Sequence, residues 1–538
     1  MKMQFNSGLA MLAASLLIGA SSCTKNFEQY NSNPAELTTA QTIAALPTAF
    51  GPLEQNIYHN YQTAQNLSAD VYGGYFMPPT PFKAQDNLNY FLVDGWDVNG
   101  FNDQYDYEMA ILAKMRADGV PAARPDYWGV ALIMQVEAMD RVTDRFGPIP
   151  YSKAGTSVTS VAYDSQQSIY NLFFLQLDTA VADLDAYIVA NPGVKPLGVN
   201  DLVYGGDYTK WVKFANSLRL RLAMRIVKVD PTTAQTQGEK ALSDPGGLMA
   251  VPSDDALVAQ SGGRSNDIWT VTAAYGNNNM NAALMTYMVG FKDPRLSVYA
   301  TPATDSTVVA RYGTGYYQGI RIGINLNQTL YENCALPNCT LPTPQAAPFG
   351  QTAPQYIMTA AEVWFLKAEA ALRGWANAGA VQTDYETGVN TSFQQWGVSS
   401  ATYLSDASST EVAYMDPHDS VDNSSPALST ITIAWDPAAG NETALERIIT
   451  QKWIAMFPDG QEAWADYRRT GYPRLFPVVN NFSGGTISTT TQIRRLAYPS
   501  NEYTTNGAAV NAAVSTLLGG PDNGGTRLWW DVAGKGNF

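Results

Sequence analysis

The spacing of apolar residues is the feature that most constrains how this chain folds. In its strongly patterned segments, apolar residues recur three and four positions apart, which is the spacing of one face of an α-helix. Strand-like alternation is scarce. The patterned segments run from Asp126 to Phe146, Ile169 to Tyr187, Asp207 to Ile226, Thr359 to Trp375, Tyr385 to Trp396 and Leu445 to Met456. The pattern predicts a mainly α protein.

The segment after Thr359 carries the clearest helix signals. Thr359 and Glu362 have the spacing of a capping box, and large and small residues alternate along one face of the segment. The segment from Tyr385 to Trp396 follows closely and is the expected partner, so we predict helix pairs of the tetratricopeptide type. No fixed period of about 34 residues connects the pairs, and we therefore expect long insertions between them.

Stretches rich in Tyr, Asn, Gly and Pro separate the predicted helices, at residues 72–105, 245–350 and 400–440. Loops of this length are either functional or poorly ordered. Aromatic rings beside amide side chains can bind a sugar, because the ring stacks on its apolar face while the amides take its hydroxyls. The candidates are Tyr75, Trp96, Trp269, Tyr275, Asn278, Tyr316 and Tyr317. The alternative is that these residues anchor the loops to the core.

The N-terminus has the pattern of an export signal. An apolar run that ends at Ala20 is shorter than the roughly 20 residues of a membrane-spanning helix. We therefore predict a lipoprotein signal peptide over residues 1–22, with Cys23 acylated, for example by palmitate. Lipoproteins usually have Leu three residues before this cysteine, where this chain has Ala20. An ordinary secreted protein is the alternative. Residues 23–538 are predicted to form a single domain.

The charge balance excludes one class of partner. The chain has 33 Lys and Arg against 48 Asp and Glu, a formal net charge of −15, and such a field repels nucleic acid. Only 15% of the residues are charged, while uncharged polar residues are abundant, which suits neutral polar ligands more than ionic ones. Many exported proteins share this composition, so it does not identify a ligand.

Cys334 and Cys339 remain once Cys23 is assigned to the lipid. In an oxidising compartment this pair favours a disulfide that closes a short Pro-rich loop, and two free thiols are the alternative. A zinc site needs about four nitrogen or sulfur ligands, and the surrounding sequence has neither a His nor a second Cys pair.

Asp94, Asp97, Asn99 and Asp103 form an acidic cluster that could hold a structural calcium ion, although their spacing is not that of an EF-hand. A solvated acidic loop is the favoured interpretation, and whether any metal binds stays open. No motif requires a cofactor.

Catalytic motifs are scarce. The chain has two histidines, His59 and His418, and lacks the G-x-S-x-G, H-E-x-x-H and P-loop patterns. A glycoside hydrolase needs only two carboxylates that face each other across a cleft, so it stays as the less favoured alternative. We predict that the protein is not an enzyme.

Several motifs follow one another along nearly the whole chain. They are the run Asp144-Arg145-Phe146-Gly147-Pro148-Ile149-Pro150-Tyr151, the stretch from Tyr204 to Ala223, the run from Leu366 to Ala371, the stretch from Trp453 to Arg469, the run from Arg494 to Pro499, and Trp529-Trp530-Asp531. In this order they resemble the SusD/RagB family of nutrient-binding outer membrane lipoproteins.

The resemblance implies a surface-exposed lipoprotein of the outer membrane, built of tetratricopeptide-like helices. Such proteins cover a SusC-like TonB-dependent barrel transporter and deliver oligosaccharides to it, and a peptide ligand, as in RagB-type relatives, is the alternative. Ligand contacts in this family come from loop aromatics that vary between members, so none is transferred by position. Trp96 is the first choice, because it lies in an early loop before a helix, where relatives often place a stacking residue.

Overall fold

The computed structural model describes residues 39–155, 160–341 and 347–538. The predicted signal peptide and Cys23 lie outside these ranges. The chain divides into two units, a short one that ends at Leu46 and contains α3 (Thr39–Ala45), and a body from Pro47 to Phe538. The body contains the predicted helix pairs.

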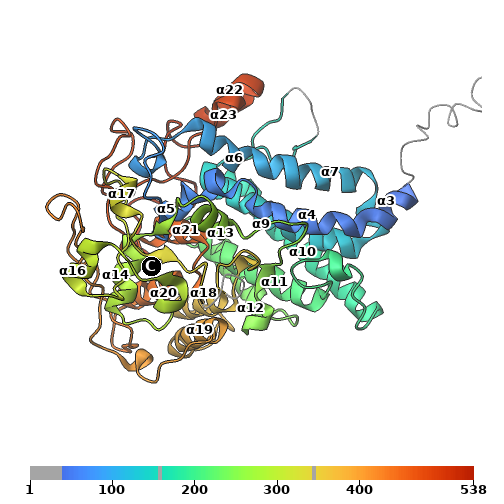
Figure 1. Ribbon diagram of the computed structural model, residues 1–538. Coiled ribbons are helices and arrows are strands. Elements are labelled where there is room, and N and C mark those ends of the chain that lie inside the picture. The colour runs from blue at the N-terminus through green and yellow to red at the C-terminus, as the bar shows by residue number, and fades with distance from the viewer. Residues whose placement is uncertain (1–38, 156–159, 342–346) are drawn as a thin grey trace, which may run out of the picture. The chain divides into compact units, whose positions relative to one another are not determined.

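Long helices lie where the apolar spacing predicts them (Figure 1). They are α9 (Pro125–Phe146), α10 (Gln166–Ala190), α11 (Tyr208–Arg225), α18 (Ala360–Leu372), α19 (Val381–Trp396) and α20 (Asn441–Ala455). The apolar spacing did not predict α12 (Pro231–Ser243) and α21 (Gly460–Thr470). The sequence marks several ends: the Asp207 carboxylate accepts a hydrogen bond from the Thr209 N–H at the start of α11, and Gly397, in the left-handed region, ends α19. In the described ranges, no helix combines the length and apolar character needed to cross a membrane.

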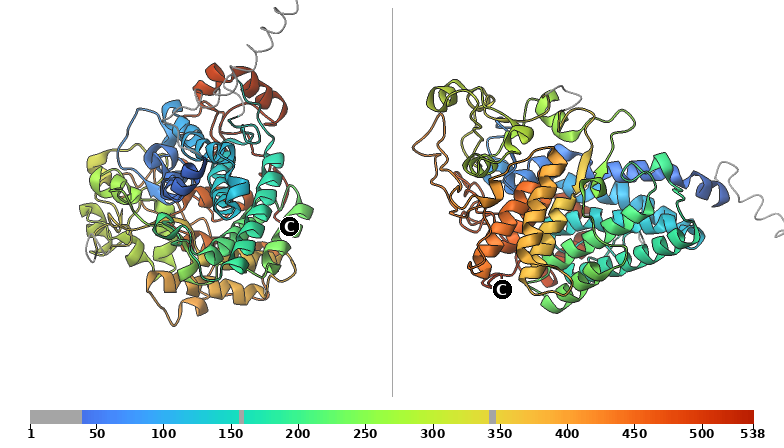
Figure 2. Two further views of the ribbon diagram at one scale, coloured as in Figure 1. Left: turned by 90° about the vertical axis from the view of Figure 1, so that its right-hand side faces the viewer. Right: turned by 90° about the horizontal axis from the view of Figure 1, so that it is seen from below.

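Neighbouring long helices pack against one another in pairs (Figure 2). The contacts join α9 to α10, α10 to α11, α11 to α12, α18 to α19 and α18 to α20. The α18–α19 contact is close because Gly388 leaves room for Phe365: a Cβ atom at Gly388 would lie 2.9 Å from carbon atoms of the ring. The predicted mainly α scaffold of helix pairs is confirmed.

Shorter helices connect and cover this scaffold. They are α4 (Phe50–Gln55), α5 (Ala69–Tyr72), α6 (Asp94–Gln104), α7 (Ala110–Ala117), α8 (Val120–Ala123), α13 (Asp267–Trp269), α14 (Ala282–Gly290), α15 (Leu296–Tyr299), α16 (Ser306–Tyr312), α17 (Gln328–Tyr331), α22 (Ser500–Thr505) and α23 (Gly507–Thr516). The 3-10 turns are η1 (Leu46–Ala49), η2 (Asn56–Tyr58), η4 (Asn87–Asn89), η6 (Gly198–Asn200), η7 (Pro252–Asp254) and η9 (Tyr403–Ser405). The π-helical turns are η3 (Gln62–Asn66), η5 (Tyr105–Met109) and η8 (Thr270–Ala274).

The strands of the described residues form short antiparallel pairs. β1 (Phe76–Met77) pairs with β3 (Asn279–Met280), β2 (Ala256–Val258) with β6 (Gln355–Met358), and β4 (Ala300–Thr301) with β5 (Leu336–Pro337). In the first pair Phe76 lies opposite Met280, and in the second the register shifts between Ala256 and Leu257. The β1–β3 pair joins two of the predicted insertions.

The predicted insertions contain more helix than their sequences suggest. α6 lies within residues 72–105, and α13 to α17 lie within residues 245–350. The sequence of α6, DGWDVNGFNDQ, is rich in Gly, Asn and Asp, which are weak helix formers. Contacts with α9 and η3 hold this helix in place. Tertiary packing has therefore overridden local propensity in this segment.

Buried ion pairs connect α9, α11, α18, α20 and α21. Arg221 on α11 lies 2.7 Å from a Glu362 oxygen on α18 and 3.3 Å from a Glu137 oxygen on α9. Arg469 on α21 lies 2.6 Å from Glu369 on α18. All of these side chains are almost completely buried, so each charge depends on its partner instead of on water.

Lys452 on α20 occupies the centre of this network. Its Nζ lies 2.7 Å from Asp466 and 3.2 Å from Glu462, both on α21. Arg225 on α11 also pairs with Glu462. Burial alone would raise the pKa of Asp466, but Lys452 and Arg469 outweigh it and hold that pKa below its usual value. Asp466 therefore stays ionised at neutral pH.

The predicted capping box of α18 is only half formed. The Thr359 hydroxyl oxygen accepts a hydrogen bond from the Glu362 N–H at 3.3 Å, as the box requires. The Glu362 carboxylate instead points into the network, where it binds Arg221 and lies 3.6 Å from Lys452. A pair of buried cations competes more strongly for this carboxylate than a backbone N–H does.

Cys334 and Cys339 are separate, buried thiols, so the predicted disulfide is not formed in the structure. β5 lies between them, and its extended backbone pairs with β4. A disulfide needs Cα atoms within about 7 Å of each other, which an extended run between two cysteines opposes. Burial raises the pKa of the Cys339 thiol to about 12, so it is protonated at neutral pH.

Replacing Glu362 with Gln tests the network. The change keeps the side-chain shape but leaves Arg221 and Lys452 with one carboxylate fewer. Because a buried cation then lacks its partner, we expect the free energy of unfolding, measured by urea denaturation, to fall by about 3–5 kcal/mol. Lys114→Met is the control, since the Lys114–Asp118 pair is exposed and should contribute less than about 1 kcal/mol. Equal losses in the two variants would contradict this assignment.

Candidate functional site

Four segments that lie far apart in the sequence are joined by side-chain contacts into a closed ring. They are η3, α6, residues 78–86 and residues 267–278. On one side, the Asn99 Nδ2 of α6 donates a hydrogen bond to the Thr63 hydroxyl of η3 at 2.7 Å. Next, the Asn66 Nδ2 of η3 donates to the Asn278 Oδ1 at 3.1 Å. These two bonds hold η3 between α6 and the chain that follows η8.

The other two contacts close the ring. The Thr80 hydroxyl donates a hydrogen bond to the Asn277 Oδ1 at 2.7 Å. Phe82 then meets Trp96 edge-on, with ring centroids 5.9 Å apart. Because Trp96 belongs to the first turn of α6, this contact returns the circuit to its starting helix. The sequence predicted that Trp96 lies in a loop before a helix. This prediction is wrong, because Trp96 lies within α6 itself.

Partly exposed aromatic side chains stand on this ring. We call Phe82, Trp96, Trp269 and Tyr275 the aromatic rim. Phe82, Trp96 and Trp269 are half-buried, and Tyr275 is 55% exposed. The Lys83 Nζ lies 5.8 Å from the centroid of the Trp96 ring. Each ring retains accessible surface, which is what stacking on a ligand requires, and Phe82 and Trp96 also support each other.

Unusual backbone geometry accompanies the rim. The π-helical turn η3 carries Thr63 and Asn66, and the π-helical turn η8 begins directly after Trp269. The Asn266 Oδ1 accepts the Trp269 N–H at 3.1 Å, and its Nδ2 donates to the backbone carbonyl of Pro354. Single π-helical turns are rare in proteins overall, and many of those that occur lie at functional sites. The two π-helical turns therefore favour a functional role for this region.

The rim has the chemistry to bind an uncharged sugar. Its aromatic rings offer flat apolar surfaces, and the half-buried amides of Asn99 and Asn277 lie on the segments that carry them. Trp96, Trp269 and Tyr275 were all predicted from the sequence. Phe82 was missed, although it belongs to the same aromatic-rich stretch, because its contact with Trp96 exists only in the folded chain.

Tyr75 and Asn278, which were also predicted as ligand residues, belong to the core. Tyr75 is completely buried, stacks on Trp453 at 5.7 Å and donates its hydroxyl to the Trp453 backbone carbonyl. Asn278 is buried too, and its amide is used by Asn66 and Thr272. Neither side chain has surface left for a ligand: Tyr75 packs against α20, and Asn278 holds η3 to the chain that follows η8.

Tyr316 and Tyr317 lie outside the four segments that form the ring. Tyr316 stacks in parallel on Tyr312, with ring centroids 4.0 Å apart, and both predicted tyrosines are half-buried. Together with Tyr414 they line a cavity of only about 10 Å³. The structure therefore does not bring this pair to the aromatic rim.

The acidic cluster of α6 is divided among different partners. Asp94 accepts hydrogen bonds from the Ser500 N–H and hydroxyl, Asp97 accepts one from Asn87, and Asp103 accepts one from Asn60. Asn99 is engaged by Thr63. Among the described residues, no group of three His, Cys, Asp or Glu side chains could hold a metal ion.

The matches to known proteins identify one family. The sequence model of a family described as Susd and RagB outer membrane lipoprotein matches residues 25–531. A solved chitin-binding SusD homolog from Flavobacterium johnsoniae is 40% identical, with a TM-score of 0.85 over 92% of this chain and 100% of that chain.

Two further solved structures are similar over the same extent. A SusD homolog from Bacteroides vulgatus is 36% identical, with a TM-score of 0.84 over 91% of this chain and 98% of that one. A SusD-like protein from Bacteroides thetaiotaomicron is 33% identical, with a TM-score of 0.84 over 91% of this chain and 100% of that one. Among curated proteins, none matches this chain.

Asp97, on the helix that carries Trp96, makes the stability of the folded protein depend on pH. Its side chain is buried on α6, and burial raises the pKa of this carboxyl to about 7, against the opposing effect of the Asn87 amide, which donates to it at 2.9 Å. The folded protein therefore holds a proton on Asp97 that the unfolded chain releases above pH ~4. This difference destabilises the folded state progressively between pH ~4 and pH ~7.

Replacing Asp97 with Asn removes this pH dependence while keeping an oxygen that accepts from Asn87. We expect the variant to match the wild type in free energy of unfolding near pH 4. As the pH rises, the free energy of unfolding of the variant should exceed that of the wild type by a growing amount. This difference should level off above pH ~7, at up to about 4 kcal/mol. Urea denaturation of both proteins at several pH values measures this difference. A difference that does not change with pH would contradict the assignment.

Proposed function

Because the chain belongs to the SusD/RagB family of outer membrane lipoproteins, we propose that it captures oligosaccharides on its aromatic rim without catalysis and passes them to a SusC-like TonB-dependent transporter. The observation that supports this proposal is the closed ring of segments, which carries the partly exposed side chains of Trp96, Trp269 and Tyr275. A site built on partly exposed aromatic rings and amides suits a neutral sugar chain better than an ionic ligand.

The first ligand to test is a chitin-type oligosaccharide. The Flavobacterium johnsoniae relative binds chitin and is 40% identical over 92% of this chain. The apolar face of an N-acetylglucosamine ring fits the flat surface of a tryptophan, and its hydroxyl and acetamido groups are partners for amide side chains. The chemistry of the rim and the ligand of this relative thus point to the same class of sugar.

The lipid anchor and the transporter complete the proposed role. Acylation of Cys23 would hold the body at the outer membrane, with the sugar-binding rim available on the cell surface. A tethered binding protein raises the concentration of its ligand beside a membrane partner, and so contributes to uptake without any reaction of its own.

Replacing Trp96 with Ala should weaken sugar binding. The change removes a stacking surface, and we expect the Kd for an N-acetylglucosamine oligomer, measured by isothermal titration calorimetry, to rise at least about tenfold, which is about 1.4 kcal/mol. Trp269→Ala should act in the same direction.

Trp364→Ala is the matched control, because Trp364 is also half-buried but lies on α18, where its indole N–H donates to the Ala250 carbonyl. Its Kd should equal that of the wild type. Release of new reducing ends during the titration would identify a hydrolase instead. Binding of peptide mixtures without binding of sugars would identify a peptide-binding relative.

Replacing Cys23 with Ala tests the anchor. In cells supplied with labelled palmitate, the wild type should carry the label and sediment with membranes, whereas the variant should lose the label. Protease added to intact cells should degrade the wild type if it faces outward. An unchanged label in the variant would contradict acylation at Cys23.

A further inference from the structure

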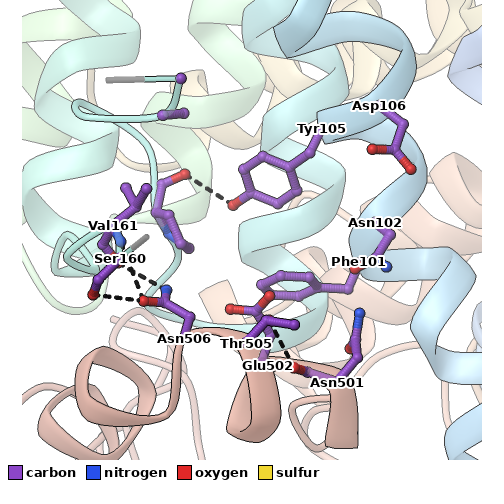
Figure 3. Close-up of a pocket in the computed structure, with 13 residues that line it drawn as sticks. Phe101, Asn102, Tyr105, Asp106, Ser160, Val161, Asn501, Glu502, Thr505 and Asn506 are labelled. Atoms are coloured by element: carbon purple, nitrogen blue, oxygen red, sulfur yellow. Dashed lines mark hydrogen bonds between the residues drawn. The ribbon is translucent and has the colours of Figure 1, made fainter. Parts of the chain in front are cut away.

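A separate cavity of about 320 Å³ lies between the end of α6 with η5, the helix α22, and the described residues 150–155 and 160–161 (Figure 3). Asp94, at the start of α6, fixes α22 to this helix by accepting the Ser500 N–H at 2.6 Å. The volume is at the lower end of the range of small-molecule sites, about 300–1,000 Å³.

One wall of the cavity is aromatic. Phe101 and Tyr105 lie one turn apart on the stretch where α6 continues into the π-helical turn η5, with ring centroids 5.4 Å apart. The Tyr105 hydroxyl donates a hydrogen bond to the Pro150 carbonyl at 2.9 Å, which fixes the orientation of its ring. In Figure 3 the Phe101 ring lies next to Glu502 and Thr505 of α22, and the Tyr105 ring lies farther from that helix.

The facing wall is polar and held in place. The Glu502 Oε2 accepts the Tyr163 hydroxyl at 2.6 Å. The Asn506 Oδ1 accepts the Ser160 hydroxyl at 2.9 Å, and its Nδ2 donates to the Val161 carbonyl at 2.8 Å. These groups are oriented by protein contacts before any ligand arrives, which reduces the ordering cost of binding.

The charges of the cavity favour a cation. Its described lining contains the carboxylates of Asp106 and Glu502 and no Lys or Arg. A second cavity of about 270 Å³ has the opposite character, with Lys228, Arg527 and Lys535 among its lining residues. Carboxylates form strong hydrogen bonds with an ammonium group, and the face of a tyrosine ring attracts one as well.

We propose that this cavity binds a sugar unit with a free, protonated amino group, such as a glucosamine unit of a partly deacetylated chitin-type chain. Glu502 receives the ammonium group, and Asp106 adds a second negative charge to the lining of the cavity. The ring of Tyr105 faces the sugar ring, and the side-chain amides of Asn102 and Asn506 are partners for its hydroxyls. The amides and hydroxyls of the lining favour a sugar over the apolar stem of a lysine. The sugar part of this inference rests on the proposed function.

The same continuous helical stretch carries both sites, since Trp96 lies in the first turn of α6 and Tyr105 follows its end. Nine residues of helix rise by about 14 Å, so the rim and the cavity are separate binding positions on one wall. An oligosaccharide of mixed acetylation could therefore be selected by two criteria, ring stacking at the rim and amine charge in the cavity.

The test compares glucosamine and N-acetylglucosamine oligomers of equal length by calorimetry. In Glu502→Gln we expect the Kd for the glucosamine oligomer to rise about tenfold, with the Kd for the acetylated oligomer unchanged. Glu332→Gln is the matched control, because it removes the same charge from an exposed residue outside the cavity and should change neither value. Thermal denaturation of each variant verifies that it is folded.

The outcomes separate the two proposals. Loss of acetylated-oligomer binding in Trp96→Ala together with no effect of Glu502→Gln on the glucosamine oligomer supports the rim and overturns the cavity. A Glu502-dependent preference for glucosamine without any binding of acetylated oligomers supports the cavity and contradicts the rim. Binding of a lysine-containing peptide through Glu502, with no binding of the glucosamine oligomer, would also overturn the proposal.

Discussion

The buried ion-pair network is the constraint on which the rest of the structure depends. Helices distant in sequence, α9, α11, α18, α20 and α21, meet through charges that water does not reach. Lys452 and Arg221 are each satisfied only when carboxylates from other helices are in place. A buried charge without its partner is strongly destabilising, so this network penalises any other arrangement of the helix pairs.

The rigid scaffold allows the inserted segments to carry function. α6 is the clearest case, since it is a poor helix former that packs on α9 and η3. One part of α6 presents Trp96 to the aromatic rim, and its far end joins η5 to form the aromatic wall of the cavity. The π-helical turns η3, η5 and η8 all lie at these two places. Local irregularity is concentrated where ligands are proposed to bind.

Much of the candidate site could be predicted from residue types, and the remainder could not. Trp96, Trp269 and Tyr275 were predicted because they stand in stretches rich in polar residues, and all three are partly exposed, although Trp96 and Trp269 lie in short helices. Tyr75 comes from the same kind of sequence, yet strand β1 follows it directly and its ring is enclosed against Trp453. The exposed fraction of an aromatic side chain depends on which helix or strand covers it. The composition of the surrounding sequence does not show which element that is. Phe82 was missed for the same reason.

The sequence by itself determined the helical scaffold, the family and the chemistry of the candidate ligand residues. Apolar spacing is a local property that survives without knowledge of neighbours, and ordered motifs identify a fold even across long insertions. Only the tertiary structure decided that Glu362 serves a buried network instead of a helix cap, that Cys334 and Cys339 stay apart, and that α6 forms at all. Each of these outcomes is set by groups brought close in space from distant parts of the chain, where burial makes charge pairing and packing stronger than local preference.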